Sequence, residues 1–156
     1  MKLKLTTNSK IMKAVLFLIF STLLITSCTV EPRPIQFGED ECVFCRMKLM
    51  DERFGAQVVT DKGRVFMFDD VNCMVMFMEE EENQRHNYAY EMVVDYSNPG
   101  ELLDVRYTFF LKSDDIRTPM NSKVIALPDE ETRDQFIEKL DHSIYLGWGE
   151  IKTQFK

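Results

Sequence analysis

Three sulfur-bearing side chains lie within six residues of one another in the segment CVFCRM, residues 42–47. Cys42 and Cys45 are three positions apart, and Met47 follows two positions later. This pattern allows three kinds of chemistry: a zinc site, a redox-active disulfide, or a site for a soft metal such as Cu(I), which thiolates and thioethers select. The rest of the chain must distinguish between them.

Zinc and redox chemistry both need partners that this sequence supplies poorly. A structural zinc site has four nitrogen or sulfur ligands, but no second cysteine pair follows, and the two histidines, His86 and His142, are far apart among charged residues. A thioredoxin-like disulfide opens a helix after a buried strand, whereas the segment FGEDE before Cys42 has no strand character. Because Thr118-Pro119 could imitate the proline loop beside such a disulfide, a thiol–disulfide reductase remains the alternative.

Later segments add further candidate ligands. Thr118-Pro119-Met120 places a thioether on a loop that proline makes rigid. Cys73 lies in the first turn of a predicted helix with Asp70 as N-cap, where the helix dipole lowers a thiol pKa. We interpret Cys73 first as a buried structural cysteine and second as a metal ligand. The sequence contains no paired nucleophile and base and no phosphate-binding loop, so we expect a binding protein and not an enzyme.

The first 27 residues have the features of a bacterial lipoprotein signal peptide. Four lysines precede an apolar run at residues 14–25, which is too short to span a bilayer, and Ile25-Thr26-Ser27 leads into Cys28 as at a lipoprotein cleavage site. We expect acyl chains on Cys28 to anchor the protein to a membrane of the cell envelope, facing the periplasm. Residues 28–40 would form a tether and residues 41–156 a single folded domain.

Charge and cysteine count narrow the function further. Without the four lysines of the leader, the formal charge changes from −7 to −11, which argues against nucleic acid as a partner. If Cys28 is lipidated, three cysteines remain. An odd number argues against a closed disulfide framework and leaves at least one free thiol.

Hydrophobic periodicity predicts two similar halves in the folded part. The first half has strands at 54–60 and 64–68, joined by a turn at 61–63, then a helix at 71–82 and a strand at 90–96. The second has strands at 105–111 and 123–127, a helix at 129–140 and a closing strand at 145–152. This order predicts an α+β fold of two ββαβ-type halves with mainly antiparallel sheet and two helices. It also assigns three methionines to the core: Met67, Met74 and Met78.

The order of four features in this chain resembles that of the NosL family of nitrous-oxide-reductase accessory lipoproteins. The features are the lipidation site, CVFCRM, the segment DERFGAQVVTDKGRVFMFDDVNCM at 51–74 and the late RTPM. The similarity covers about residues 41–144. It implies a membrane-anchored Cu(I)-binding protein with two ββαβ halves. Such a copper chaperone would deliver copper to the nitrous oxide reductase apoprotein and its assembly machinery.

The resemblance also implies a ligand set. The family's motif cysteines fall on Cys42 and Cys45, its motif methionine on Met47, and the TPM methionine on Met120. We expect Cys45 and Met120 to be the main Cu(I) ligands, with Cys42 or Met47 assisting, and a copper ion could bridge two chains. Arg46 replaces the motif glycine. If that glycine has positive φ, an arginine there costs about 1 kcal/mol, while its guanidinium would favour thiolate.

Overall fold

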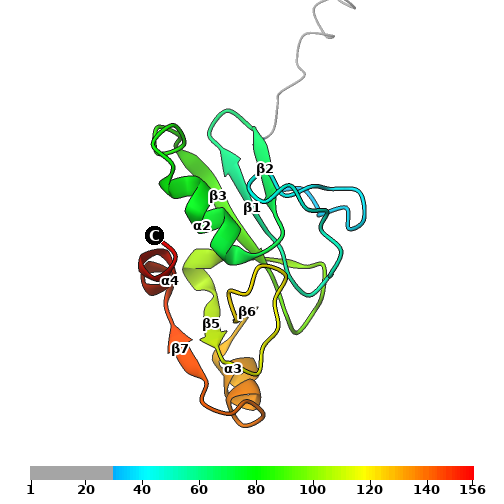
Figure 1. The fold of residues 1–156 in the computed structure, drawn as a ribbon, viewed down its shortest axis with the longest axis vertical. Coiled ribbons are helices and arrows are strands. Elements are labelled where there is room, and N and C mark those ends of the chain that lie inside the picture. The colour runs from blue at the N-terminus through cyan, green and yellow to red at the C-terminus, as the bar shows by residue number, and fades with distance from the viewer. Residues whose placement is uncertain (1–29) are drawn as a thin grey trace, which may run out of the picture.

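Two ββαβ units follow each other along the chain, as the element order predicted (Figure 1). The computed structural model describes residues 30–156. The first unit contains β1 (Ala56–Thr60), β2 (Val65–Phe68), α2 (Val71–Glu79) and β3 (Tyr88–Val94), followed by β4 (Leu102–Asp104) and a 3₁₀ turn at Val105–Tyr107. The second contains β5 (Phe109–Lys112), β6 (Val124–Leu127), α3 (Glu130–Ile137) and β7 (Ile144–Leu146), and α4 (Trp148–Gln154) ends the chain.

Both units use the same strand order. The first sheet runs β2-β1-β3-β4 and the second β6-β5-β7, and every pair is antiparallel. In each unit the first strand is therefore central, with the hairpin partner on one side and the strand after the helix on the other. This arrangement confirms the predicted α+β class and its two ββαβ halves.

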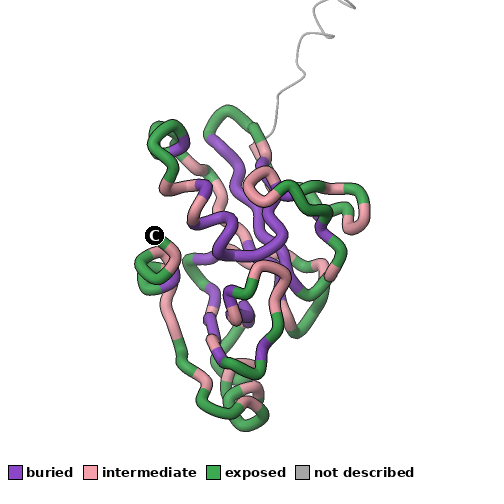
Figure 2. The backbone as a smooth tube through the Cα atoms, viewed as in Figure 1, coloured by how far each residue is buried: buried purple, intermediate pink, exposed green. Residues whose placement is uncertain are grey.

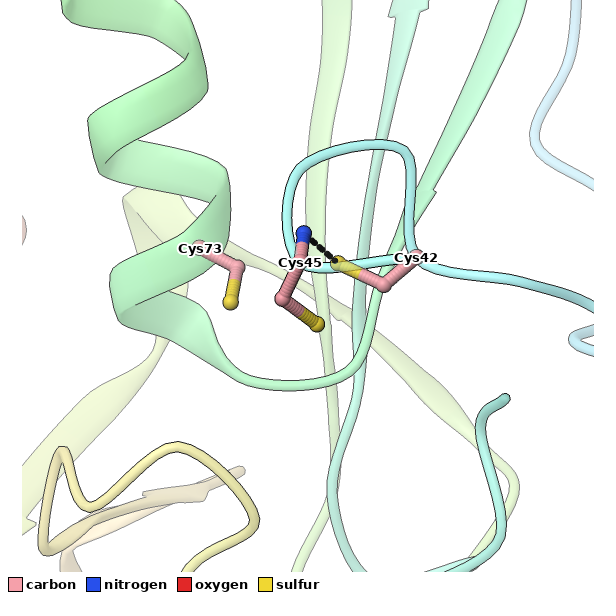
Figure 3. Close-up of side chains that lie close together, drawn as sticks. All are labelled: Cys42, Cys45 and Cys73. Carbon is pink, nitrogen blue, oxygen red and sulfur yellow. Dashed lines mark hydrogen bonds between the residues drawn. The ribbon is translucent and has the colours of Figure 1, made fainter. Parts of the chain in front are cut away.

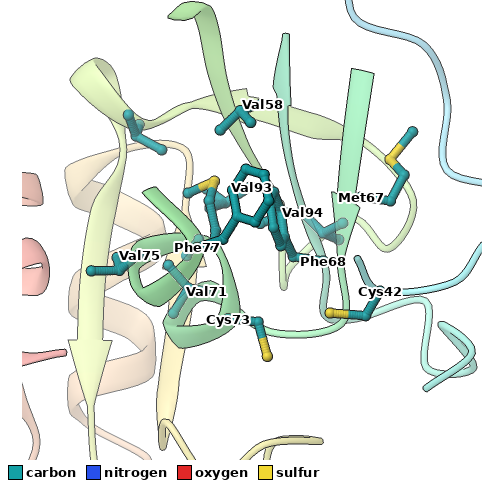
Figure 4. Close-up of a cluster of buried hydrophobic side chains, with 14 of the residues drawn as sticks. Cys42, Val58, Met67, Phe68, Val71, Cys73, Val75, Phe77, Val93 and Val94 are labelled. Carbon is teal, nitrogen blue, oxygen red and sulfur yellow. The ribbon is translucent and has the colours of Figure 1, made fainter. Parts of the chain in front are cut away.

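The first unit holds most of the core (Figure 2). Every residue of β1 is buried, because α2 and the segment that precedes β1 both pack against this sheet. Phe77 of α2 packs against Phe66 and Phe68 of β2, with ring centroids 4.8 and 5.2 Å apart. Cys42 and Cys73 lie next to each other at one end of this cluster (Figure 4). The core assignment is confirmed for Met67 and Met74, and Met78 packs half-buried against the cluster.

The closing strand expected at residues 145–152 is present, but it is much shorter than predicted. β7 ends at Leu146, and α4 follows, so the described residues contain three helices where the sequence predicted two. The carboxylate of Glu150 accepts a hydrogen bond from the Gly147 N–H (2.7 Å) and starts this helix. Fully buried Ile151 anchors it, and the Trp148 indole donates to Glu91 of β3 (2.7 Å).

Part of the expected tether belongs to the folded domain. Arg33 forms a two-bond bridge to the carboxylate of Asp40 and exchanges two main-chain hydrogen bonds with the buried side chain of Gln57 in β1. Ile35 is only 7% exposed. The segment from Arg33 to Asp40 is thus docked on the first unit. The signal peptide and Cys28 lie outside the described residues, and among residues 30–156 no helix is long and apolar enough to cross a membrane.

Candidate metal centre

The three cysteines of the described chain converge on one point. Cys42 and Cys45 come from the loop before β1, and Cys73 comes from the first turn of α2 (Figure 3). Their Sγ atoms all lie within 4.8 Å of one another, and all three thiols are free. Cys42 and Cys73 are fully buried, whereas Cys45 is half-buried. The cluster is therefore closed on its protein side and accessible at Cys45.

A tight loop positions the first two thiols. Glu41 and Lys48 form an antiparallel bridge at its base, and the Cys42 N–H donates to the Met47 carbonyl (2.8 Å). The Arg46 N–H donates back to the Cys42 carbonyl (2.9 Å), a closure that Arg46 allows by taking φ +66°. The Val43 N–H donates to the Met67 carbonyl (3.0 Å) and fastens this loop to β2. Arg46 therefore has the positive φ that the sequence analysis considered for the motif glycine.

Hydrogen bonds within the cluster lower the pKa of one thiol and raise that of another. The Cys73 thiol donates to Cys42 and, with the N–H groups of Cys45 and Asp69, lowers the Cys42 pKa to about 5 against the opposing effect of burial. The same bond and burial raise the Cys73 pKa, and burial raises that of Cys45. At neutral pH the arrangement favours one thiolate held by two neutral thiols.

Two expectations about these pKa values are wrong. The helix dipole was expected to lower the Cys73 pKa, but its role as donor to the Cys42 thiolate raises it instead. The Arg46 guanidinium was expected to favour thiolate, but its side chain is exposed, and the donors that lower the Cys42 pKa are S–H and N–H groups. Burial and the nearby Cys42 charge also raise the pKa of Asp69 to about 6.

The Met120 loop lies at the start of the helix that carries Cys73. Asp70 occupies the N-cap position of α2, but its side chain makes no capping hydrogen bond to the helix. Its carboxylate instead accepts from the Met120 N–H (3.1 Å) and the Thr118 hydroxyl (2.6 Å). The predicted capping role of the Asp70 side chain is therefore wrong. The Met120 side chain is half-buried and packs against the main core cluster.

Met47 differs from the other candidates. Its main chain belongs to the cysteine loop, where its N–H donates to the Cys45 sulfur, but its side chain is 46% exposed. Neither histidine belongs to the thiol cluster: the His86 ring lies beside the rings of Phe66 and Tyr88, and His142 follows α3. The structure thus unites Cys42, Cys45 and Cys73, and metal binding by these residues, Met47 and Met120 remains a prediction. The sequence clue to Cys73 was its place in the helix's first turn.

The fold and the cluster define a small α+β domain with a buried three-thiol centre. The NosL family model matches residues 34–154, and the chain belongs to the NosL family. This confirms the resemblance found in the sequence. The fold matches the crystal structure of the copper chaperone NosL from Shewanella denitrificans with a TM-score of 0.64 at 17% sequence identity, covering 78% of this chain and 96% of that one. No curated protein sequence matches this chain significantly.

Proposed function

We propose that this NosL-family protein is a copper chaperone that carries Cu(I) as cargo. The observation that supports this most is the set of three free thiols whose Sγ atoms lie within 4.8 Å of one another, open to the surface only through half-buried Cys45. Thiolate and thioether sulfur favour Cu(I) over harder ions. The description of its structural relative as a copper chaperone is consistent with the same role.

The sulfurs have different tasks in this proposal. Cys42 supplies the thiolate that first attracts the cation, because its pKa is about 5. Cys45 and Cys73 lose their protons as the metal binds, since thiolate is the ligand form, and Met120 adds a thioether. Two or three of these four sulfurs hold the ion at a time. The low coordination leaves a position at which a partner's ligand can attack, so copper passes by exchange without release into solution.

The alternative, a thiol–disulfide reductase, fits the geometry less well. The Cys42–Cys45 pair lies in a bridged loop and not at the start of a helix, where the dipole would activate an attacking thiol. The thiol of lowered pKa, Cys42, is fully buried. A substrate disulfide could not reach it without opening the loop. The proposal therefore assigns the pair to metal binding and includes no catalysis.

The setting of the chaperone is part of the proposal. The leader with Cys28 supports a lipid-anchored protein of the cell envelope facing the periplasm. The family supports the nitrous oxide reductase apoprotein and its assembly machinery as the recipients of copper. The exposed Met47 side chain and the half-buried Cys45 also leave room for a copper ion shared between two chains.

An anaerobic Cu(I) competition titration against a chromophoric chelator tests the proposal. The reduced protein should take up one Cu(I) per chain, or one per two chains if copper bridges a dimer. Cys45→Ser should abolish competition and Met120→Leu should weaken it. Met50→Leu is the matched thioether control, since Met50 is 69% exposed and lies outside the cluster. Failure of the parent protein to compete, or equal losses in Met50→Leu and Met120→Leu, would refute the proposal.

A further inference from the structure

Asp70 connects the loop that carries Met120 to the first turn of α2, which carries Cys73. It is 1% exposed, and its Oδ2 accepts three hydrogen bonds from one loop: the Thr118 hydroxyl at 2.6 Å, the Met120 N–H at 3.1 Å and the Ser122 N–H at 3.3 Å. Its carbonyl accepts from the N–H of Cys73 at 3.1 Å. One residue therefore holds the Met120 loop with its side chain and the Cys73 turn with its main chain.

Asn72 completes the attachment by binding the carbonyl of the same residue, Met120. Its Nδ2 donates to the Met120 carbonyl at 2.9 Å. The N–H and the C=O of Met120 are thus both bound by side chains from the start of α2. The Oδ1 of Asn72 is buried and has no hydrogen-bond partner among the described residues, a cost that this orientation of the amide incurs. The position of Met120 relative to Cys73 is consequently set by α2 and not by the loop alone.

The hydrogen bonds that hold the Met120 loop explain why residue 70 carries a carboxylate. Asp70 makes no ion pair within residues 30–156, so its burial is compensated by hydrogen bonds alone. All three donors converge on Oδ2, and hydrogen bonds to a carboxylate are stronger than those to a neutral amide oxygen. Substitution by asparagine keeps the size of the side chain and leaves one acceptor oxygen, but it removes the negative charge that strengthens these three bonds.

We propose that Asp70, assisted by Asn72, is a positioning residue that holds Met120 as a metal ligand next to the three-thiol cluster. This inference rests on the proposed copper function, and it adds a role for a residue that does not itself bind the ion. Residues that orient a metal ligand typically change metal affinity about 10–100-fold when replaced. We expect a loss of that size in Asp70→Asn, transmitted through Met120.

The test is a double-mutant cycle on Cu(I) affinity with Asp70→Asn, Met120→Leu and the double variant. If Asp70 acts through Met120, its substitution weakens binding in the parent but has no further effect once Met120 is leucine. Thr118→Val removes the 2.6 Å bond to Asp70, together with the longer contacts of the same hydroxyl to the Ser122 hydroxyl and the Lys123 N–H. It leaves the Met120 and Ser122 N–H bonds to Asp70 in place and should give a smaller loss with the same dependence. It keeps the test usable if Asp70→Asn folds poorly. Asp95→Asn is the matched control, because Asp95 is also buried and accepts two bonds from Ser97.

The outcomes separate the inference from the function on which it rests. Unchanged affinity in Asp70→Asn and Thr118→Val, or losses that add to that of Met120→Leu, would overturn the positioning role while leaving Cys45-dependent copper binding in place. A loss in Asp95→Asn equal to that in Asp70→Asn would show a general effect of disturbing buried carboxylates, which also overturns it. A parent protein that binds no Cu(I) would overturn the proposed function and this inference together.

Discussion

Arg46→Gly should stabilise the protein without changing its metal site. Arg46 has φ +66°, and its side chain is exposed, with no hydrogen bond or ion pair from its guanidinium among residues 30–156. A residue with a Cβ pays about 1–2 kcal/mol in this left-handed conformation. Glycine removes that cost, but its greater conformational freedom in the unfolded chain lowers the stability by about 0.4–1 kcal/mol. The net expectation is a gain of about 0.5–1 kcal/mol, or about 2–4 °C in Tm.

Chemical denaturation of the reduced, metal-free protein measures this gain, with Arg46→Ala as the matched control. Alanine removes the same side chain but keeps the Cβ, so its stability should stay within about 0.5 kcal/mol of the parent. Cu(I) affinity should be unchanged in both variants, because the Arg46 N–H still closes the loop on the Cys42 carbonyl. Equal stabilisation by alanine and glycine, or none by glycine, would refute backbone strain as the cause.

Three further predictions concern the domain boundary, the thiolate and the last helix. Ile35→Ala should lower the free energy of unfolding by about 2–3 kcal/mol, because Ile35 is buried, whereas Glu31→Ala at an exposed position should have almost no effect. Equally small effects in both variants would show that residues 28–40 form a tether throughout. Absorbance of the apo-protein at 240 nm should show one thiolate that is lost as the pH falls through about 5. Cys42→Ser should remove this transition, and a first transition near pH 8–9 in the parent protein would contradict a lowered Cys42 pKa. Trp148→Phe should cost about 1 kcal/mol in thermal unfolding by leaving the Glu91 carboxylate without its indole donor, and no change would show that this bond does not hold α4.

Local patterns were sufficient to predict the ββαβ units. Alternation and helical spacing are properties of neighbouring residues, and the Asp61-Lys62-Gly63 turn, with Gly63 at φ +78°, joins β1 and β2 as expected. The last helix could not be found in this way. α4 has seven residues, only one of them buried, too few to show a helical period. Its start depends on a hydrogen bond from the Gly147 N–H to Glu150, and its packing depends on Glu91, far away in the sequence.

The site was predictable in its residue types but not in its arrangement. CVFCRM and Thr118-Pro119-Met120 were recognisable as sulfur-bearing segments, but a cysteine in the first turn of a helix is as compatible with a core position as with a site. Cys73 becomes part of the centre only because the loop of Cys42 and Cys45 is fastened to β2. The N-cap position of Asp70 followed from its neighbours, whereas the direction of its side chain depends on a loop about 50 residues later.

The most direct test of the proposed copper site is Cu K-edge X-ray absorption of the Cu(I)-loaded protein. We predict a first shell made of sulfur alone, with two or three scatterers, and the loss of one sulfur in Met120→Leu, which weakens binding without abolishing it. A first shell containing nitrogen or oxygen in the parent protein, or a sulfur shell unchanged in Met120→Leu, would contradict the three-thiol centre and its Met120 ligand.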